Sequence, residues 1–521
     1  MLMNIIYKIS VALFLMLGTQ LAFAQENDVL NTPATLERQE QNSFWKKAKN
    51  PAGLQLDRPF EYSQLSVGIE NYGGDFRRPQ QGKSGNRQLV QTEGNLFLGD
   101  YYLSGAFSYT RDNIKQAEFN ASIIDPFRGM PYMVADLNPS DWNNQYYDMQ
   151  FSIATPTFNE RWSFGLAANY KVSSGAKQRD LRAENYYYTI AITPGLVYTP
   201  ATNHHIGLNL AYSNVKEQSS ISKMNTDIDQ VYYELLGLGT AVSNSGTINR
   251  ENNYEGDVRG AGIQYNFQGK VNVFLSADYS EEAEDLQVSF STPRDGASVL
   301  RKIWNTKLTL STSGGKLSHF VDLNYYNRNM DGIQYVTQRD NSSAQLGWQT
   351  LFKSIRSTYS SQNAGFQYHL LMNRGAAYSW KINTGLSYER LNDVYILPNS
   401  VKQIENLLFT IGGKKNFMLS DKKSQHLLVG AELGYKENLS GGYHYNGVNP
   451  ESPVVTGLEQ TDFNYLSAKY FSVAVPFIYS RKIKEDSKNT FFAKARVQYL
   501  STNSFNYKER YLSSFSAGVN F

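Results

Sequence analysis

The sequence predicts an all-β fold, a transmembrane barrel of antiparallel strands. Three observations lead to this class. Apolar residues alternate with polar ones over eight segments, each about as long as the roughly 9 to 11 residues of a tilted membrane strand. Each of these segments ends in a tyrosine on the apolar row. Beyond its N-terminal region the chain contains no run approaching the roughly 18 apolar residues that a membrane helix needs.

The composition suits a sheet that meets lipid on one face and water on the other. The 521 residues include 37 Tyr, 28 Phe and 39 Gly, only 41% are apolar, and the mean hydropathy is −0.47. A soluble chain of this length would form several domains, whereas a barrel wall grows with each added hairpin, so we expect one domain. The net charge of +3 gives no reason to expect nucleic acid as a partner. The absence of cysteine excludes disulfides and thiolate metal sites.

The first residues have the pattern of a secretory signal peptide. Lys8 precedes the apolar run Ile9 to Leu17, and Ala22-Phe23-Ala24 forms a small-residue cleavage site. We expect residues 1–24 to be the signal peptide, residues 25–63 a periplasmic N-terminal segment and residues 64–521 the barrel. An uncleaved anchor helix is the alternative, but the apolar run is short for a membrane span.

The tyrosines that end the eight segments predict an aromatic girdle at one membrane interface. A typical row is Trp162, Phe164, Leu166, Ala168 and Tyr170. In an interfacial girdle each ring meets acyl chains and each hydroxyl meets headgroups. Amphipathic strands of a soluble sandwich are the alternative, but strand propensity alone does not fix tyrosine at one end of alternate strands. The predicted outer girdle comprises Tyr109, Tyr170, Tyr212, Tyr279, Tyr325, Tyr388, Tyr435 and Tyr499.

The opposite register of the same segments carries small, polar and charged residues. A charge facing lipid near the midplane costs roughly 2–4 kcal/mol, so these side chains are expected to face a watery lumen. The charged lumen-facing candidates are Lys171, Asp278, Asp322, Lys381, Glu389, Glu432, Lys436, Lys494 and Arg496.

Connection lengths predict about eighteen strands, with sixteen or twenty also possible. The connections that precede the tyrosine-ending segments are short and those that follow are long, which places short turns in the periplasm and long loops outside. The longest loops are expected at Arg111–Gln145, Ser213–Asp257 and Asn438–Asp462. Residues 327–363, in which Ala344, Leu346 and Trp348 alternate like a strand, are assigned to a further outer loop that contains a hairpin or a short helix. An even strand number places both termini in the periplasm.

The last residues form an alternating aromatic row, Tyr511, Phe515, Val519 and terminal Phe521. This row resembles the signal that the barrel assembly machinery of the outer membrane reads in its client proteins. The resemblance implies an outer-membrane protein of a Gram-negative bacterium, in contact with lipid and lipopolysaccharide. In size and tyrosine content the chain resembles functionally unassigned outer-membrane barrels.

A short motif precedes the first strand. The motif is Asn50-Pro51-Ala52-Gly53-Leu54, and Phe44-Trp45 precedes it. It resembles the barrel entrance of FadL-like fatty-acid transporters, and this resemblance implies transport of a hydrophobic ligand. The other interpretation is a turn that seals the periplasmic mouth.

The N-terminal segment, Gln25 to Ser63, is too short for the folded plug domain of TonB-dependent transporters. We expect it to enter the lumen as a small hatch. In this hypothesis Phe44 and Trp45 are anchors, and Lys46, Lys47 and Lys49 face lumenal carboxylates.

The remaining titratable motifs predict no metal site, cofactor or enzyme. The acidic run Glu281, Glu282, Glu284 and Asp285 is interpreted as a solvated loop, with Ca²⁺ or lipopolysaccharide bridging as the alternative. His204-His205 has no ligand partner at metal spacing, and His319 has no recognisable nucleophile beside it.

The predicted function is a channel or transporter for a small solute, partly occluded by loops and the N-terminal segment. The alternative is a non-conducting accessory or surface-binding barrel that partners a TonB-dependent uptake complex or a surface lipoprotein. An outer-membrane hydrolase is the less favoured third reading.

Overall fold

The computed structural model describes residues 31–57, 59–225, 227–246, 248–289, 292–312, 315–340, 347–420, 424–485 and 488–521. The expected signal peptide, residues 1–24, lies outside the described residues. Residues 31–521 form one compact unit, which is the unit described below.

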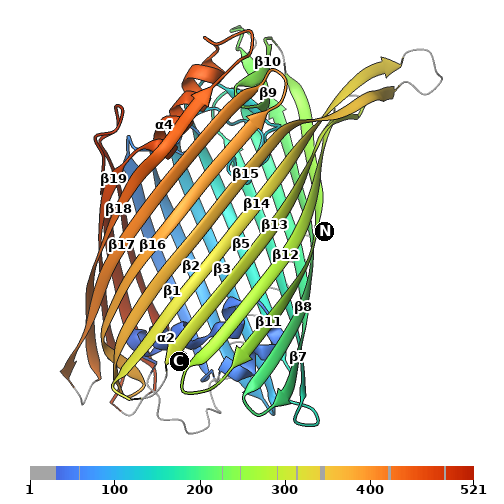
Figure 1. Cartoon of the computed structure of the whole chain (residues 1–521). Coiled ribbons are helices and arrows are strands. Elements are labelled where there is room, and N and C mark those ends of the chain that lie inside the picture. The colour runs from blue at the N-terminus through green and yellow to red at the C-terminus, as the bar shows by residue number, and fades with distance from the viewer. Residues whose placement is uncertain are drawn as a thin grey trace. The chain divides into compact units, whose positions relative to one another are not determined.

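Eighteen antiparallel strands form a closed barrel in which each strand pairs with the next along the chain (Figure 1). The last strand returns to the first, with Gln64 opposite Asn520 and Gly74 opposite Arg510. The predicted fold class and strand number are therefore confirmed. The wall strands are β1 (Tyr62–Gly74), β2 (Ser84–Leu98), β3 (Tyr101–Ala117), β5 (Ser140–Ala154), β6 (Trp162–Lys177), β7 (Arg182–Ala201), β8 (His204–Ser222), β11 (Asn249–Phe267), β12 (Asn272–Ser289), β13 (Arg294–Thr312), β14 (Leu317–Asp340), β15 (Gly347–Arg374), β16 (Ala377–Tyr395), β17 (Ser400–Ser420), β18 (Gln425–His444), β19 (Tyr470–Lys482), β20 (Thr490–Ser501) and β21 (Glu509–Asn520).

The shorter elements lie in the N-terminal segment and in the long connections. They are α2 (Pro33–Asn42), α3 (Phe44–Lys47), the 3₁₀ helix η1 (Pro51–Asp57), the π-helix η2 (Val454–Glu459), α4 (Gln460–Ser467) and a separate small sheet in which β9 (Tyr232–Gly237) pairs with β4 (Val134–Asp136) and β10 (Thr240–Asn244). No helix in the described part of the chain is both long enough and apolar enough to cross a membrane.

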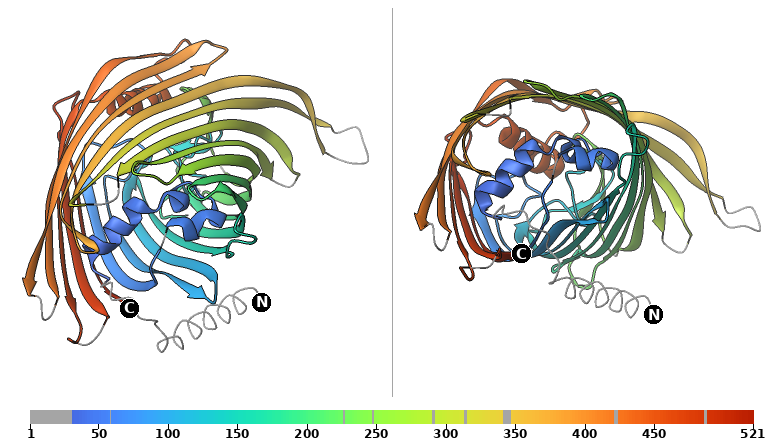
Figure 2. Two further views of the ribbon diagram at one scale, coloured as in Figure 1. Left: turned by 60° about the horizontal axis from the view of Figure 1, so that its bottom comes forward. Right: turned by 90° about the horizontal axis from the view of Figure 1, so that it is seen from below.

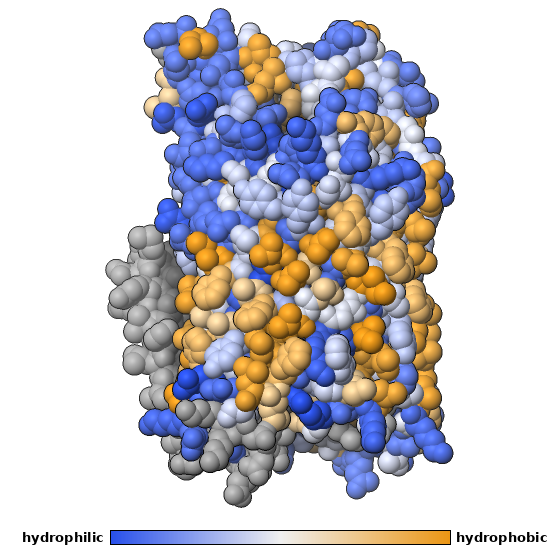
Figure 3. Space-filling model, turned by 90° about the vertical axis from the view of Figure 1, so that its left-hand side faces the viewer, coloured by the Kyte–Doolittle hydropathy of each residue, from blue (hydrophilic) through white to orange (hydrophobic). Residues whose placement is uncertain are grey.

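The alternating pattern places apolar side chains on the outer face of the wall. On β8, Leu208 is 48% exposed whereas the next residue, Asn209, is 5% exposed. The same alternation recurs around the barrel, and on the face shown in Figure 3 it produces an orange apolar band below a blue hydrophilic region. No other described part of the protein covers these apolar rows, as contact with acyl chains requires.

The tyrosine girdle marks the upper edge of this band. The hydroxyls of Tyr279 and Tyr435 each donate a hydrogen bond to a glutamate two residues further along the same strand, Glu281 and Glu437, at 2.6 Å. Tyr499 donates to a carboxylate on the neighbouring strand in the same way. The ring of each therefore sits at the end of the apolar row and its hydroxyl at the start of the polar surface.

The strands continue well beyond the girdle, which corrects the predicted boundaries. Residues 327–363 do contain the expected hairpin, but it is not a separate loop element, because β14 and β15 of the wall themselves run through most of this stretch and pair with each other to their ends. Trp348 lies in β15, whereas Ala344 and Leu346 lie outside the described residues. Outside the membrane a sheet keeps its backbone hydrogen bonds but no longer needs a lipid-facing apolar row, so the periodicity there becomes weak.

For the same reason two of the three longest loops are shorter than expected. The first two span residues 118–139 and 223–248, because the flanking strands extend into the predicted ranges, whereas the third spans residues 445–469, which is the predicted length shifted along the chain by seven residues. We call the end of the barrel with these connections the loop end and the opposite end, with connections such as Gly99–Asp100, the turn end.

A charge placed on the outer row should destabilise the barrel in the membrane. We expect Leu208→Arg to lower the free energy of unfolding in lipid vesicles by about 2–4 kcal/mol, because the side chain faces acyl chains. The matched control is Val448→Arg, at a loop position that is 93% exposed. Urea titration of both variants measures the difference, and an equal effect of the two would contradict the membrane assignment of this row.

Candidate functional site

The lumen is filled at the turn end by the N-terminal segment. Helices α2 and α3 and η1 lie across the opening when the barrel is seen from below (Figure 2). Helix α2 begins at Thr32, whose hydroxyl accepts from the backbone N–H of Thr35, with Pro33 in the first turn. We call residues 31–57 the N-terminal plug.

Aromatic packing anchors the N-terminal plug to the wall. Trp45 is fully buried and meets Phe274 of β12 edge to face, with ring centroids 5.2 Å apart, and Phe44 packs on the same ring at 5.8 Å. Phe274 belongs to the inward row of β12, so both plug aromatics lie inside the barrel. The structure places the two predicted anchor residues in one apolar cluster with the lumenal wall.

The Asn50 motif docks into a notch made by wall glycines. The Asn50 side-chain amide donates to Gln264 Oε1 at 2.7 Å, and its Oδ1 accepts from the Ala52 N–H at 3.1 Å. A Cβ on Gly165 of β6 would overlap the backbone of Ala52, and one on Gly195 of β7 would overlap Asn50 Oδ1. The glycines are therefore needed for close approach, a role that the sequence pattern did not reveal.

Ion pairs of the N-terminal plug differ from those expected. Lys46 pairs with Glu40 of the plug itself at 3.0 Å, whereas Lys47 donates to the Gln41 carbonyl at 2.9 Å and also interacts electrostatically with the wall carboxylate of Asp322. The reason is that α2 turns its own polar groups towards the two lysines. Lys49 interacts electrostatically with Asp278, as the hatch hypothesis expects of this residue.

The ion pair that links the N-terminal plug to the wall uses an acidic plug residue instead. Glu37 accepts from Lys414 at 3.0 Å and from the Tyr378 hydroxyl at 2.7 Å. Burial acts to raise the pKa of Glu37, but Lys414, Tyr378 and Lys381 outweigh it and hold the pKa below its ordinary value. The charged form of Glu37 therefore favours docking.

A second carboxylate of the N-terminal plug, also half-buried, behaves in the opposite way. Asp57 accepts from the backbone N–H groups of Trp45 at 3.1 Å and Lys46 at 3.0 Å, at the start of α3. Burial raises the pKa of Asp57 from 3.8 to about 7, and these hydrogen bonds only partly offset the effect.

Separate elements fill the lumen at the loop end. The small sheet of β4, β9 and β10 packs with η2 against inward residues of the wall, and we call these elements together with α4 the loop plug. Its apolar core includes Ile123, Met130, Tyr132, Leu235 and Val454. Figure 1 shows β9, β10 and α4 gathered at this end of the barrel.

Buried ion pairs fix the loop plug to the wall. Arg128, from the connection before β4, pairs with Glu217 of β8 and with Glu284 of β12. Arg301 of β13 binds Glu284 at 2.8 Å and Glu282 at 2.7 Å. Breaking one partner of such a pair leaves an uncompensated buried charge, so the network holds this connection in one position.

The acidic run is therefore part of a strand rather than a solvated loop. Residues Glu281 to Asp285 lie on β12, where alternation sends Glu282 and Glu284 inwards and Glu281 outwards. The loop interpretation is wrong because a run of like charges hides this alternation. Among the described residues no group of three or more His, Asp or Glu side chains is arranged to hold a metal ion.

Further contacts hold α4 and β4. Asp462 of α4 binds Arg78 at 2.5 Å and Lys402 at 3.0 Å, and these cations keep the pKa of Asp462 below its ordinary value although burial acts to raise it. Lys177 and Asp136 form a fully buried pair at 2.6 Å. None of these residues was a candidate from the sequence, because their partners are distant along the chain.

The predicted lumen-facing residues lie on the inward rows and many are paired. Their contacts are Lys171–Asp148 at 3.5 Å, Asp322–Lys307 at 3.5 Å, Glu432–Arg496 at 2.9 Å, Asn406 donating to Glu389 at 3.2 Å, Lys436 donating to the Leu466 carbonyl at 2.5 Å, and Lys494 over the Phe492 ring at 4.5 Å. Lys381 lies near Glu37 of the N-terminal plug. The candidates thus line two separate regions rather than one site.

The C-terminal row lies on the outer face, where Tyr511, Phe515 and Phe521 are exposed. The backbone of Phe521 pairs with Ser63, and its carbonyl accepts from the Asn31 side chain at 3.1 Å. The start of the N-terminal plug is therefore tied to the seam between β21 and β1.

The histidines singled out in the sequence have hydrogen-bond partners. His205 bonds the Thr199 hydroxyl at 2.9 Å, His204 bonds the Tyr265 hydroxyl at 2.8 Å, and His319 bonds the Tyr368 hydroxyl at 2.8 Å. In each case the partner is a neighbouring wall or turn residue, as a structural role requires.

Comparison with known proteins gives a fold likeness and a family. The chain is similar to BauA, the ferric preacinetobactin receptor from Acinetobacter baumannii, at 9% identity over 89% of this chain and 80% of that one, with a TM-score of 0.41. It is also similar to FyuA, the ferric yersiniabactin uptake receptor from Yersinia pestis, at 8% identity over 89% and 80%, with a TM-score of 0.42. At this level of similarity the function of those receptors does not transfer to this chain.

No curated protein matches the chain. The motif that resembles the FadL entrance serves here to dock the N-terminal plug through Asn50. The model of a family of unknown function, DUF6850, matches residues 51–521, and the chain belongs to that family.

Proposed function

We propose that the chain is an outer-membrane barrel that is closed at rest and passes a small solute only when the N-terminal plug leaves its notch. The observation that carries the proposal is the docking of Asn50 and Trp45 against wall glycines. The plug can approach the wall this closely only because glycine has no side chain. Most of the polar contacts of this segment with the wall are single hydrogen bonds, such as those of Arg38 with the Gly375 and Ala377 carbonyls and of Gln55 with the Asp100 carbonyl, and its ion pair is Glu37–Lys414.

The proposal includes an orientation and a route of assembly. The loop end faces the outside and the turn end, with both termini, faces the periplasm, because short turns are typical of the periplasmic side. The chain is exported by its signal peptide and the C-terminal row ending in Phe521 is read by the assembly machinery. We assign it no enzymatic activity and no cofactor.

Filling the glycine notch should release the N-terminal plug. We expect Gly165→Val to expose a cysteine introduced at buried Ala48, the only thiol in the chain, to a membrane-impermeant maleimide at least tenfold faster, and to produce discrete currents in planar bilayers. The matched control is Gly105→Val, where the nearest atom to the new Cβ is the Gln150 carbonyl oxygen at 3.7 Å. Release without current would show that the loop plug is the barrier and would contradict the proposed gate.

The docking should also depend on pH. The pKa of Asp57 is raised in the docked state, so docking takes up a proton and weakens as pH rises towards 7, by at most about tenfold per unit. The pKa of Glu37 is lowered, so its contribution is present at neutral pH and is lost only as pH falls through the acidic range. Docking should therefore be tightest at mildly acidic pH.

The labelling rate of the cysteine at position 48 measures this dependence, divided at each pH by the rate for the same chain unfolded in urea. We expect the normalised rate to rise between pH 5 and 7 and to be flat over that range in Asp57→Asn. A rise of the same size in Asp57→Asn would assign the pH dependence to another group.

One observation favours a second candidate function, a surface-binding accessory barrel. Residues 335–340 of β14 and 347–353 of β15 pair only with each other, and this hairpin bends away from the barrel (Figure 1). Its free edges expose Leu351 and Phe352, and the adjoining Ile355 of β15 is exposed as well, beside more basic than acidic residues. An exposed strand edge of this kind accepts an added strand, so the fitting partner is an extended segment with acidic and apolar residues.

A peptide of alternating Glu and Val tests this candidate. We expect it to bind the unaltered protein and the control Val448→Asp, but not Phe352→Asp/Ile355→Asp, in a fluorescence anisotropy titration. Equal binding of a peptide of alternating Lys and Val would contradict the charge argument, and equal binding to all three proteins would remove the hairpin as the site.

A further inference from the structure

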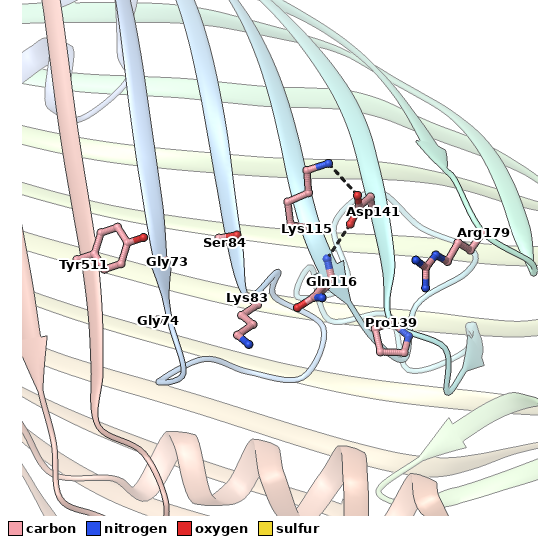
Figure 4. Close-up of a pocket in the computed structure, with 10 residues that line it drawn as sticks. All are labelled: Gly73, Gly74, Lys83, Ser84, Lys115, Gln116, Pro139, Asp141, Arg179 and Tyr511. Atoms are coloured by element: carbon pink, nitrogen blue, oxygen red, sulfur yellow. Dashed lines mark hydrogen bonds and ion pairs between the residues drawn. The ribbon is translucent and has the colours of Figure 1, made fainter.

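A basic pocket lies on the outer face of the wall. It has a volume of about 660 Å³ and is formed by residues of β1, β2, β3, β5 and β21 and of the connections before β2, before β5 and after β6 (Figure 4). Its charged lining residues are Lys83, Lys115, Arg179 and Asp141. Neutral hydrogen-bonding groups of Ser84, Gln116 and Tyr511 also line it.

Strand register shows that the pocket is outside the barrel. Tyr511 stands on the exposed row of β21 with Phe515. The ladder pairs Tyr511 with Gly73, Gly73 with Ser84, and Ser84 with Lys115. Residues directly opposite each other in a sheet point to the same face, so Ser84 and Lys115 share the face of the apolar belt.

The same register gives the height of the pocket. Tyr511 pairs with the girdle residue Tyr499, so one edge of the pocket lies at the interface. Lys115 lies six residues beyond the girdle residue Tyr109 on β3, which for a strand tilted by about 40° is roughly 15 Å above the interface. The pocket therefore spans the layer that lipid headgroups occupy.

The charges of the pocket favour an anion. Asp141 accepts from Lys115 Nζ at 2.8 Å and from the Gln116 N–H at 3.1 Å, which neutralises one cation. Lys83 and Arg179 form no direct ion pair among the described residues, and Arg179 interacts with Asp141 only at longer range. Figure 4 shows the two side chains at the rim of the same hollow, and an arginine with a lysine and hydroxyl groups is a set that binds phosphate.

We propose that this pocket binds the phosphorylated sugar headgroup of an outer-leaflet glycolipid. Lys83 and Arg179 bind the phosphate, and Ser84 and Tyr511 bind sugar or phosphate oxygens. The acyl chains then lie along the apolar rows of β21 and β1, where Phe515 and Val67 are exposed. The proposal rests on the outward orientation of the loop end given above, but it does not depend on the gate.

Binding of diphosphoryl lipid A and of its phosphate-free form to the full-length barrel in detergent tests the proposal, with inorganic phosphate as a third probe. We expect Lys83→Gln/Arg179→Gln to weaken binding of the phosphorylated form at least tenfold. The matched control is Lys302→Gln, an exposed lysine on β13 close to girdle level and outside the pocket, which should change binding less than twofold.

A gain in affinity provides a result that misfolding cannot produce. Asp141→Asn removes a repulsive carboxylate and frees Lys115, so it should strengthen binding of diphosphoryl lipid A severalfold. Three results would each overturn the proposal. They are equal binding of the phosphate-free form, unchanged binding of diphosphoryl lipid A to the double variant, and competition by inorganic phosphate at the same concentration as the lipid.

The orientation is tested separately by antibody labelling of an epitope inserted at Val448 on intact cells. Labelling supports the outward loop end whether or not lipid A binds. Absence of labelling with an intact barrel would refute the orientation, and with it the glycolipid as the natural occupant of the pocket.

Discussion

Closure of the backbone hydrogen-bond ladder is the constraint on which the rest of this structure depends. In a bilayer an unpaired N–H or C=O finds no water, so β21 must return to β1 and leave no edge. Closure separates two faces with opposite requirements. The outer row is apolar over the membrane, and every polar group of the inner row needs a partner inside the barrel.

The partners that the polar groups of the inner row need come largely from other segments of the same chain. At the turn end, aromatic packing on Phe274 and the glycine notch hold the N-terminal plug, and Glu37 supplies its ion pair to the wall. At the loop end, Arg128 and Arg301 satisfy the buried glutamates of β8 and β12. The two plugs are held by different interactions. Separating a closely packed apolar contact leaves no unpaired charge, whereas breaking a buried ion-pair network leaves an uncompensated charge inside the barrel. That difference is why we place the movable element at the turn end.

The outer face of the wall carries three separate features. The girdle tyrosines end the apolar rows, the β14–β15 hairpin presents free edges beyond the rest of the wall, and the basic pocket lies on other strands, at β1, β2, β3 and β5. Because strands run on past the girdle, the wall offers a large water-exposed surface that a minimal membrane barrel lacks. Proposed contacts with lipid and with a partner therefore use separate parts of the same sheet.

The sequence by itself predicted the fold class, a number of about eighteen strands and the face of the eight tyrosine-ending segments, because period-two alternation is a local property of consecutive residues. It also singled out Phe44, Trp45 and the Asn50 motif. Only the tertiary structure decided what those residues contact. The notch glycine Gly165 and the partners Glu37–Lys414 and Arg128–Glu284 lie far apart along the chain, and their contacts depend on barrel closure. The strand ends were missed for a related reason, since the ladder beyond the membrane is held by backbone pairing, which leaves no hydropathy pattern in the side chains.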